Sequence, residues 1–281
     1  MTSSSDGRTP KFDTWESYFY PETMTDGITG TLRNIPGYRD EDDLKQFEYH
    51  QASINELELR TGAVPLPRTY DADHLRAIHR HMFKGVYEWA GEYRSISMQK
   101  DATRFAELPE IDRYLMVANK VILDTDWPQV DRKGFADATA EIYANINQAH
   151  PFREGNGRAG KLFMQQVAEL SSWRITYDPQ TSRITPQMWN QQSMLSAPDF
   201  GKTTPDPKPL LPVFYNAALP ATAGPVADLA VARVARVRTV GGPTPDLAEG
   251  QRAGRPDAQH ASPTMAQNLT QQHRRNGPRR S

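Results

Sequence analysis

The fold of this chain is expected to depend on the nine residues 150–158, which read His150-Pro151-Phe152-Arg153-Glu154-Gly155-Asn156-Gly157-Arg158. Upstream, residues 135–146 carry apolar side chains at helical spacing. A second helical period runs downstream through Leu162, Phe163, Val167 and Leu170. We therefore predict that the nine residues form a loop between two helices of a mainly α domain.

This loop has the composition of an anion site. Gly155 and Gly157 can take positive φ at little steric cost, and alternating backbone twists there would turn successive N–H groups inward around Asn156. The nest would open into the next helix, whose first N–H groups are unpaired and whose dipole is positive. Arg158 adds a forked, permanently charged donor. The pattern indicates a phosphate-binding site.

Two further residues of the stretch suggest chemistry. Glu154 is a hard oxygen ligand suited to a Mg²⁺ ion that already carries phosphate oxygens. His150, at the end of the preceding helix, is of the type that serves as a base near pH 7. Each feature alone is more often a turn, a structural histidine or a surface ion pair. Their joint occurrence at short fixed offsets favours the functional interpretation.

The stretch resembles the signature of Fic proteins, His-x-Phe-x-Asp/Glu-Gly-Asn-Gly-Arg-x-x-Arg. The match is unbroken from His150 to Arg158, and it departs at the last position, where this chain has Lys161. Similar stretches also stand elsewhere, and together they cover roughly residues 12–215: Asn34 to Gly37, Val86 to Gly91, Lys100-Asp101 and Phe105-Ala106.

The resemblance implies a protein adenylyltransferase that moves AMP from ATP to a Tyr, Ser or Thr hydroxyl of a target protein and releases pyrophosphate. His150 would be the general base. Glu154 would hold Mg²⁺, and Arg158 would neutralise the leaving pyrophosphate. The remaining nucleotide-binding positions that the resemblance implies are Gly155, Asn156, Gly157, Lys161, Lys100 and Asp101. Phe152 would anchor the loop.

Lys161 replaces the family arginine that meets the γ-phosphate. Lysine keeps the charge but loses the bidentate fork, so we expect weaker orientation of that phosphate and retained chemistry. Two alternatives stay open: a Fic enzyme that transfers another phosphate-containing group, and a catalytically degenerate Fic-like binding module. The intact Gly-Asn-Gly core favours AMP over other groups, and the intact His150 and Glu154 argue against degeneracy.

Outside the signature, capping residues predict further helices. Asp40 to Asp43 should open a helix that runs to about Leu59 and stops at Gly62, and Asp71 should cap a second helix. Helices should also begin near Pro109 and at Thr185-Pro186, and a last short one should span 210–218. Residues 171–178 are expected to form an irregular link.

A small hairpin is expected before the signature. Residues 93–98 and 103–107 would form its strands, with the turn near 99–102. By resemblance this hairpin is a flap beside the active site, and the target protein would dock along it near 93–107 by strand addition. Three histidines, His74, His79 and His81, have no fourth ligand at a recognisable spacing, so we assign them a packing or solvated role.

The composition sets the domain limits. Residues 1–11 are predicted to be a disordered lead, 12–221 a Fic-type helical domain, and 222–281 a low-complexity, disordered basic tail. Net charge is −1, which makes nucleic acid an unlikely partner. Zero cysteines and the lack of any long apolar run fit a cytoplasmic protein with no membrane partner, with delivery to a host cell left open.

Control is expected to come from outside the chain. Many Fic proteins carry an inhibitory helix with Ser/Thr-x-x-x-Glu-Gly/Asn. Here Glu followed by Gly or Asn occurs only at Glu154 and Glu249, and four residues earlier stand His150 and Pro245. We therefore favour a separate small inhibitory antitoxin protein. The alternative is that Lys161 has made such inhibition ineffective and that control lies in expression or delivery.

Overall fold

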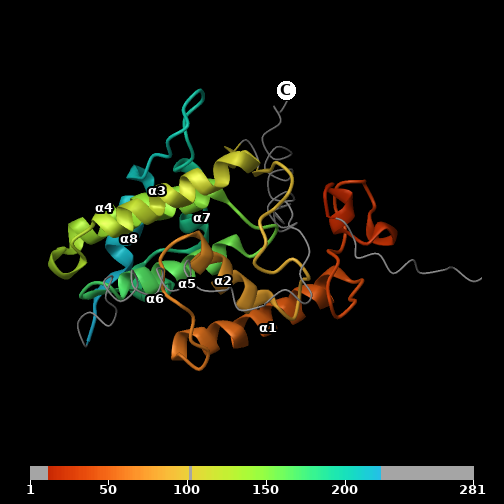
Figure 1. Ribbon diagram of the computed structural model, residues 1–281, viewed down its shortest axis with the longest axis horizontal. Helices are drawn as coiled ribbons and strands as arrows, with labels where there is room; N and C mark the ends of the chain where they lie inside the picture. Colours follow the sequence, from red (N-terminus) through yellow and green to blue (C-terminus); the bar gives the residue numbers. More distant parts are fainter. Residues whose placement is uncertain (1–11, 101–102, 223–281) are drawn as a thin grey trace, which may run out of the picture.

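The computed structural model describes residues 12–100 and 103–222 (Figure 1). The predictions of disorder at 1–11 and from 223 onward lie outside the described residues, as does Asp101. Within the described ranges the fold is mainly helical with a small hairpin, as predicted. None of its helices combines the length and apolar character needed to span a bilayer.

The elements follow in chain order. The helices are α1 (Glu41–Thr61), α2 (Ala72–Phe83), α3 (Ile111–Asp124), α4 (Arg132–Ala149), α5 (Asn156–Ala168), α6 (Pro179–Ser182), α7 (Pro186–Leu195) and α8 (Leu211–Ala217). The strands are β1 (Gln99–Lys100), β2 (Thr103–Arg104), β3 (Trp173–Ile175) and β4 (Ala218–Pro220). Single 3₁₀ turns precede α3, α4 and α8.

Helix α4 is the centre of the packing. It contacts α3 along its length, and it also contacts α8 and α5, while α2 bridges between α5 and α1 (Figure 1). Its buried face carries Phe135, Ala140 and Ile142, none of which is exposed. The helices that flank the signature are thus the most enclosed elements, and α1 closes the opposite side of the domain.

Capping residues begin and end the helices as the sequence predicts. The Asp40 carboxylate accepts from the amides of Asp42 and Asp43 at the start of α1, and Gly62 ends that helix at φ 73°. Asp71 caps α2 in the same way. A cap is a local signal, so these boundaries could be predicted without knowing the tertiary fold.

The predicted hairpin is present, but the expected extent of its strands was wrong. Residues 93–98 are not a strand. The ladder pairs Gln99 with Arg104 and Lys100 with Thr103, so β1 lies in the predicted turn and β2 covers only the first two residues of the predicted second strand. The reason is the buried Arg94, whose guanidinium donates to the carbonyls of Ile96 and Ala106. The backbone wraps around this cation instead of entering a ladder.

The irregular link predicted at 171–178 was also wrong in part. Residues Trp173–Ile175 form β3, which pairs antiparallel with β4 after α8. The pairing joins segments more than forty residues apart, and no local pattern reports such a contact.

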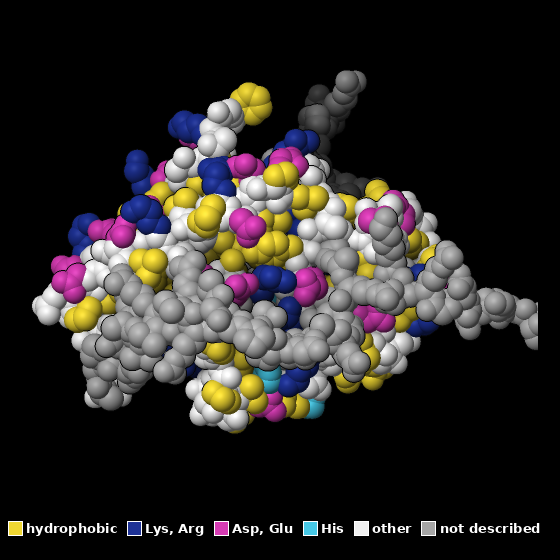
Figure 2. Space-filling model, viewed as in Figure 1, with side chains coloured by type: hydrophobic (Ala, Val, Ile, Leu, Met, Phe, Trp, Pro, Cys, Tyr) yellow, Lys and Arg dark blue, Asp and Glu magenta, His cyan; other side chains and the backbone are white. Residues whose placement is uncertain are grey.

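The three histidines of α2 pack and are not solvated. His74, His79 and His81 are all buried, and the described residues hold no cluster of three groups suited to a metal ion. Figure 2 shows acidic and basic side chains intermingled over the face in view, outside the parts covered by grey atoms.

We predict that stability falls on mild acidification. Burial lowers the pKa of His74 to about 4 and that of His79 to about 3, from 6.5. Both are neutral in the folded state, while the unfolded chain binds protons below pH 6.5. The free energy of unfolding should therefore be full above pH 6.5 and decrease towards pH 4, by about 1.4 kcal/mol per proton and pH unit.

Urea unfolding at pH 7, 6 and 5 measures this dependence. His74→Gln should remove one of the two proton uptakes and flatten the curve. A free energy of unfolding that stays constant between pH 7 and 5 in the wild type would contradict the assignment.

Candidate active site

The signature loop is shorter than predicted. His150 ends α4 in the left-handed region at φ 40°, and α5 begins at Asn156, so the loop comprises residues 150–155. Gly155 has φ 84°, whereas Gly157 lies inside the first turn of α5 with ordinary helical backbone. Only one of the two glycines therefore needs its conformational freedom.

Helix α2 supports the loop from below. The ring of Phe152 stacks on that of His79, with centroids 3.8 Å apart. His79 Nδ1 accepts the amide of Gly91 at 2.8 Å, so Nε2 carries the proton and donates to the Glu154 carbonyl at 2.7 Å. Phe152 is fully buried, which fits its predicted anchoring role.

Asn156 closes the loop on itself. Its Oδ1 accepts the amide of Phe152 at 2.9 Å, and its Nδ2 donates to the Phe152 carbonyl at 2.8 Å. The asparagine side chain thus acts as a pair of backbone groups and holds the loop in a ring.

Arg153 is a supporting residue that the sequence reasoning did not identify. It is fully buried, and its guanidinium lies over the rings of Trp15, Tyr18 and Phe19, at 4.8, 5.1 and 5.2 Å. These aromatic residues form the N-terminal cluster, and attraction between the cation and the ring faces ties that segment to the loop.

Arg94 is a second such residue, and it fixes His150. Its Nε donates to the His150 carbonyl and its backbone amide to the Pro151 carbonyl, each at 2.7 Å. Because the same guanidinium also bonds to Ala106, it joins the base of the hairpin to the end of α4. The His150 ring is buried and stacks on Phe105, with centroids 3.6 Å apart.

The start of α5 is left open to an anion. Aspartate side chains cap α1, α2 and α4, but the residue before α5 is Gly155, which has no side chain to cap it. A Cβ placed on Gly157 would meet no atom within 4 Å, so the space beside this turn is empty. Uncapped amides, a positive dipole end and open space together suit a phosphate.

Arg158 projects from the first turn of α5 between two carboxylates. Its Nη2 bonds to Glu48 of α1 and lies 3.6 Å from Oε1 of Glu154. Burial alone would lower the pKa of Arg158, but Glu48 and Glu154 outweigh it, so the net pKa is raised. The guanidinium also rests against the rings of Tyr49 and Phe83.

The residues present fit a magnesium ion that is held mainly by a nucleotide. Glu154 is partly exposed at the loop, and the described residues hold no cluster of three groups that could bind a metal ion without further ligands. Mg²⁺ commonly binds through one or two carboxylates together with substrate phosphates. One available carboxylate beside an open helix start meets that requirement.

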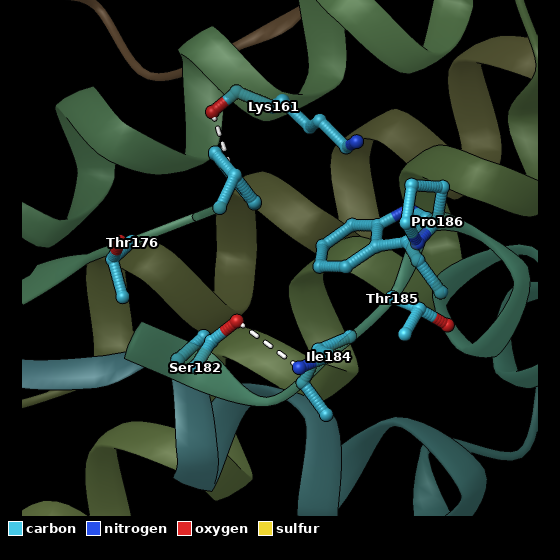
Figure 3. A pocket seen from close by; sticks show the side chains of 9 residues that line it. Lys161, Thr176, Ser182, Ile184, Thr185 and Pro186 are labelled. Atoms are coloured by element: carbon cyan, nitrogen blue, oxygen red, sulfur yellow. Dashed lines mark hydrogen bonds between the residues drawn. The ribbon is translucent and has the colours of Figure 1, made fainter. Parts of the chain in front are cut away.

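Lys161 lies one turn further along α5. Its ammonium stands 5.2 Å from the ring centre of Tyr177 and 5.0 Å from that of Trp189, and Figure 3 shows the side chain running towards Pro186. Burial lowers the pKa of Lys161, and Glu56 opposes the shift. Lys161 and Arg158 both line a cleft of about 410 Å³. Its predicted contact with a γ-phosphate stays a prediction.

The structure brings the predicted residues of 150–158 together around one loop and the start of one helix. Lys100 lies in β1, and Asp101 falls outside the described residues, so their predicted roles stay predictions. Glu48, Tyr87, Arg94 and Arg153 are the neighbours that sequence reasoning missed as site residues. Tyr87 stands in one of the stretches that carry the family resemblance, whereas nothing local marks Glu48 or Arg94.

Comparison with known proteins agrees with this geometry. Residues 69–168 match the Fic/DOC family. The chain is 32% identical over 149 residues to a probable protein adenylyltransferase, y4lH, of Sinorhizobium fredii, covering 52% of this chain and 75% of that protein. The chain therefore belongs to the Fic/DOC family.

A second relative and a solved structure point the same way. The protein adenylyltransferase VbhT of Bartonella schoenbuchensis is 32% identical over 158 residues, which are 56% of this chain and 33% of that longer protein. The N-terminal Fic domain of a putative cell filamentation protein from Bartonella quintana, solved with bound ADP, superposes with a TM-score of 0.62 at 25% identity. It covers 73% of this chain and 96% of that one.

We predict opposite effects of alanine at the two signature glycines. In Gly155→Ala, the new Cβ would lie 2.4 Å from the Phe83 ring at a positive φ, so the domain should lose about 1–3 kcal/mol of stability or more. In Gly157→Ala, the Cβ enters open space on a helix, so stability should hold or rise by up to about 1 kcal/mol.

Thermal unfolding of the two variants tests this, with binding of Mg-ADP as the second readout. Gly157→Ala should bind more weakly although it is folded, because its methyl group occupies the space beside the open amides. Equal stability of Gly155→Ala and wild type would contradict the packing argument.

Proposed function

We propose that the protein transfers AMP from ATP to a hydroxyl group of a target protein and releases pyrophosphate. The observation that supports this most is the placement of His150 and the uncapped start of α5 at the two ends of one six-residue loop, residues 150–155. A base and an anion site so joined suit attack on a phosphorus atom. The names of the relatives support the same activity.

His150 takes the proton from the acceptor hydroxyl as the oxygen attacks the α-phosphorus in line. Phe105 stacks on one face of the His150 ring, and Arg94 fixes the His150 backbone through its carbonyl. A ring with restricted motion keeps its orientation towards the acceptor hydroxyl, and such preorganisation lowers the activation barrier.

The start of α5 binds the phosphates. Amides of the first turn and the Arg158 guanidinium neutralise the charge that moves onto the leaving pyrophosphate. Glu154 is the residue that would hold Mg²⁺, which supplies further charge neutralisation when bound. Lys161, which lines the same cleft as Arg158, would meet the far end of the triphosphate.

The target protein docks along the hairpin. Strands β1 and β2 make a sheet of two strands, so each has an outer edge that a further strand can join. Because the Ala106 amide donates to the Gln148 carbonyl at 2.8 Å, this sheet is tied to the last turn of α4, directly before His150. An extended segment added there lies beside the base.

A separate inhibitory protein controls the enzyme. The inhibitor would bind in the cleft beside Arg158 and Lys161, which Glu56 and Arg60 of α1 also line. Expressed alone in a bacterium, the wild type should slow growth and His150→Ala should not. Equal growth of the two strains, with soluble protein and the target present, would contradict this part of the proposal.

We predict that His150→Ala lowers transfer by about 10²–10⁴-fold while Mg-ADP binding is retained, because a positioned base is lost and the anion site remains. Parallel incubations with α-³²P and γ-³²P ATP, followed by mass spectrometry of the labelled protein, measure this. Label from the α-phosphate alone supports AMP transfer. Label from the γ-phosphate would indicate phosphate transfer, and no label in any lysate would favour a binding module.

We predict a modest gain for Lys161→Arg. The variant restores the fork that binds a phosphate at two points, and its planar group can still stack on Tyr177 and Trp189. The KM for ATP should decrease or transfer should increase, with thermal stability as the control. A loss of activity in a stable variant would mean that the aromatic pocket has adapted to lysine.

A further inference from the structure

A buried carboxylate outside the signature contacts the signature arginine. Glu48 of α1 is 6% exposed, and its two oxygens accept from different donors. Oε1 accepts from Arg158 Nη2 and Oε2 from the Tyr87 hydroxyl. The three residues come from three segments of the chain, since Glu48 lies in α1, Tyr87 after α2 and Arg158 in α5. A buried carboxylate with both oxygens paired avoids the cost of burying an unpaired charge.

Tyr87 serves this arrangement as a permanent donor. It is buried against Trp89, with ring centroids 4.3 Å apart. Burial and the nearby Glu48 carboxylate raise the pKa of Tyr87 well above 10, so its hydroxyl keeps the proton it donates. The direction of the Glu48 carboxylate is thereby fixed before any ligand arrives.

Arg158 lies near two carboxylates, and it forms its hydrogen bond with Glu48. Glu154 Oε1 lies 3.6 Å from the same Nη2, which is beyond a good hydrogen bond. If Glu48 were absent, Arg158 could form an ion pair with Glu154 and so occupy the carboxylate that is proposed to bind Mg²⁺. Meanwhile the buried Nη1 of Arg158 makes no hydrogen bond with any described residue, so a donor remains for a ligand oxygen.

We propose that Glu48 and Tyr87 are positioning residues of the phosphate site. They hold one arm of the Arg158 fork towards α1, leave the other arm to a phosphate oxygen, and keep Arg158 off Glu154. This inference rests on the proposed nucleotide site. Partners that orient a binding residue in this way commonly change affinity or activity by 10–100-fold when they are replaced.

Isothermal titration with inorganic pyrophosphate, at several Mg²⁺ concentrations, tests the proposal on three variants. Glu48→Gln should bind pyrophosphate about 10–100-fold more weakly, and its Mg²⁺ requirement should rise because Arg158 then pairs with Glu154. Tyr87→Phe should show a smaller loss in the same direction. Glu58→Gln is the matched control, because it makes the same charge change on α1 at a residue that pairs with His81. It should bind pyrophosphate like the wild type.

A double variant separates positioning from a general effect on the fold. If Glu48 acts through Arg158, then Glu48→Gln should add nothing to the loss caused by Arg158→Gln. Full additivity of the two losses would overturn the proposal. So would unchanged pyrophosphate affinity and Mg²⁺ dependence in a folded Glu48→Gln protein.

The remaining outcomes are also decisive. If Glu48→Gln does not fold, Tyr87→Phe decides, because it keeps the Glu48 charge, and unchanged binding by that variant overturns the proposal. A wild type that binds pyrophosphate but transfers no AMP contradicts the proposed function alone. A wild type that binds no pyrophosphate contradicts both.

Discussion

The close approach of Gly155 to Phe83 and His79 is the constraint on which the site depends. No side chain fits between the loop and α2, because a Cβ on Gly155 would lie 2.4 Å from the Phe83 ring and 3.2 Å from His79 Nε2. The loop can therefore turn at this point only with glycine in the left-handed region. That turn ends the loop, lets His79 reach the Glu154 carbonyl, and begins α5 without a capping side chain. The open helix start, and with it the proposed anion site, follows from one backbone contact with the core.

Two buried arginines hold the loop on either side of this contact, and they do so by different means. Arg153 is held by aromatic faces, whereas Arg94 donates to main-chain carbonyls at the end of α4, where the helix leaves its last acceptors unpaired and its dipole is negative. Both arginines can therefore hold the loop in place without contacting a ligand. The two arginines thus fix the backbone of the loop that joins the buried His150 to the helix carrying the half-buried Arg158.

What could be predicted from the sequence is what is local. Caps such as Asp40 and Asp71 act within one turn, and the signature is contiguous, so α1, α2 and the loop between α4 and α5 could be placed from the residues alone. The contacts of Glu48 with Arg158 and of Arg94 with His150 join segments 110 and 56 residues apart. A lone glutamate on a helix or a lone arginine before a hairpin carries no signal of such a partner. The predicted bounds of the hairpin strands were wrong for the same reason, since burial of Arg94 overrides the alternation that predicted a strand at 93–98.

The pairing of β3 with β4 bears on the order in which the domain forms during translation. Helices α1 to α5 and the signature loop all precede Ser171, whereas α8, which packs against α4, and strand β4 come later in the chain. Strand β3 can pair with β4, and Arg174 with Leu219, only after α6, α7 and α8 have been synthesised. Because a domain generally folds as a unit, the packing of α4 against α8 and the closing of this sheet both require the chain up to Pro220 to have left the ribosome. The chain continues beyond Pro220, so this last step can take place while the remaining residues are still being synthesised.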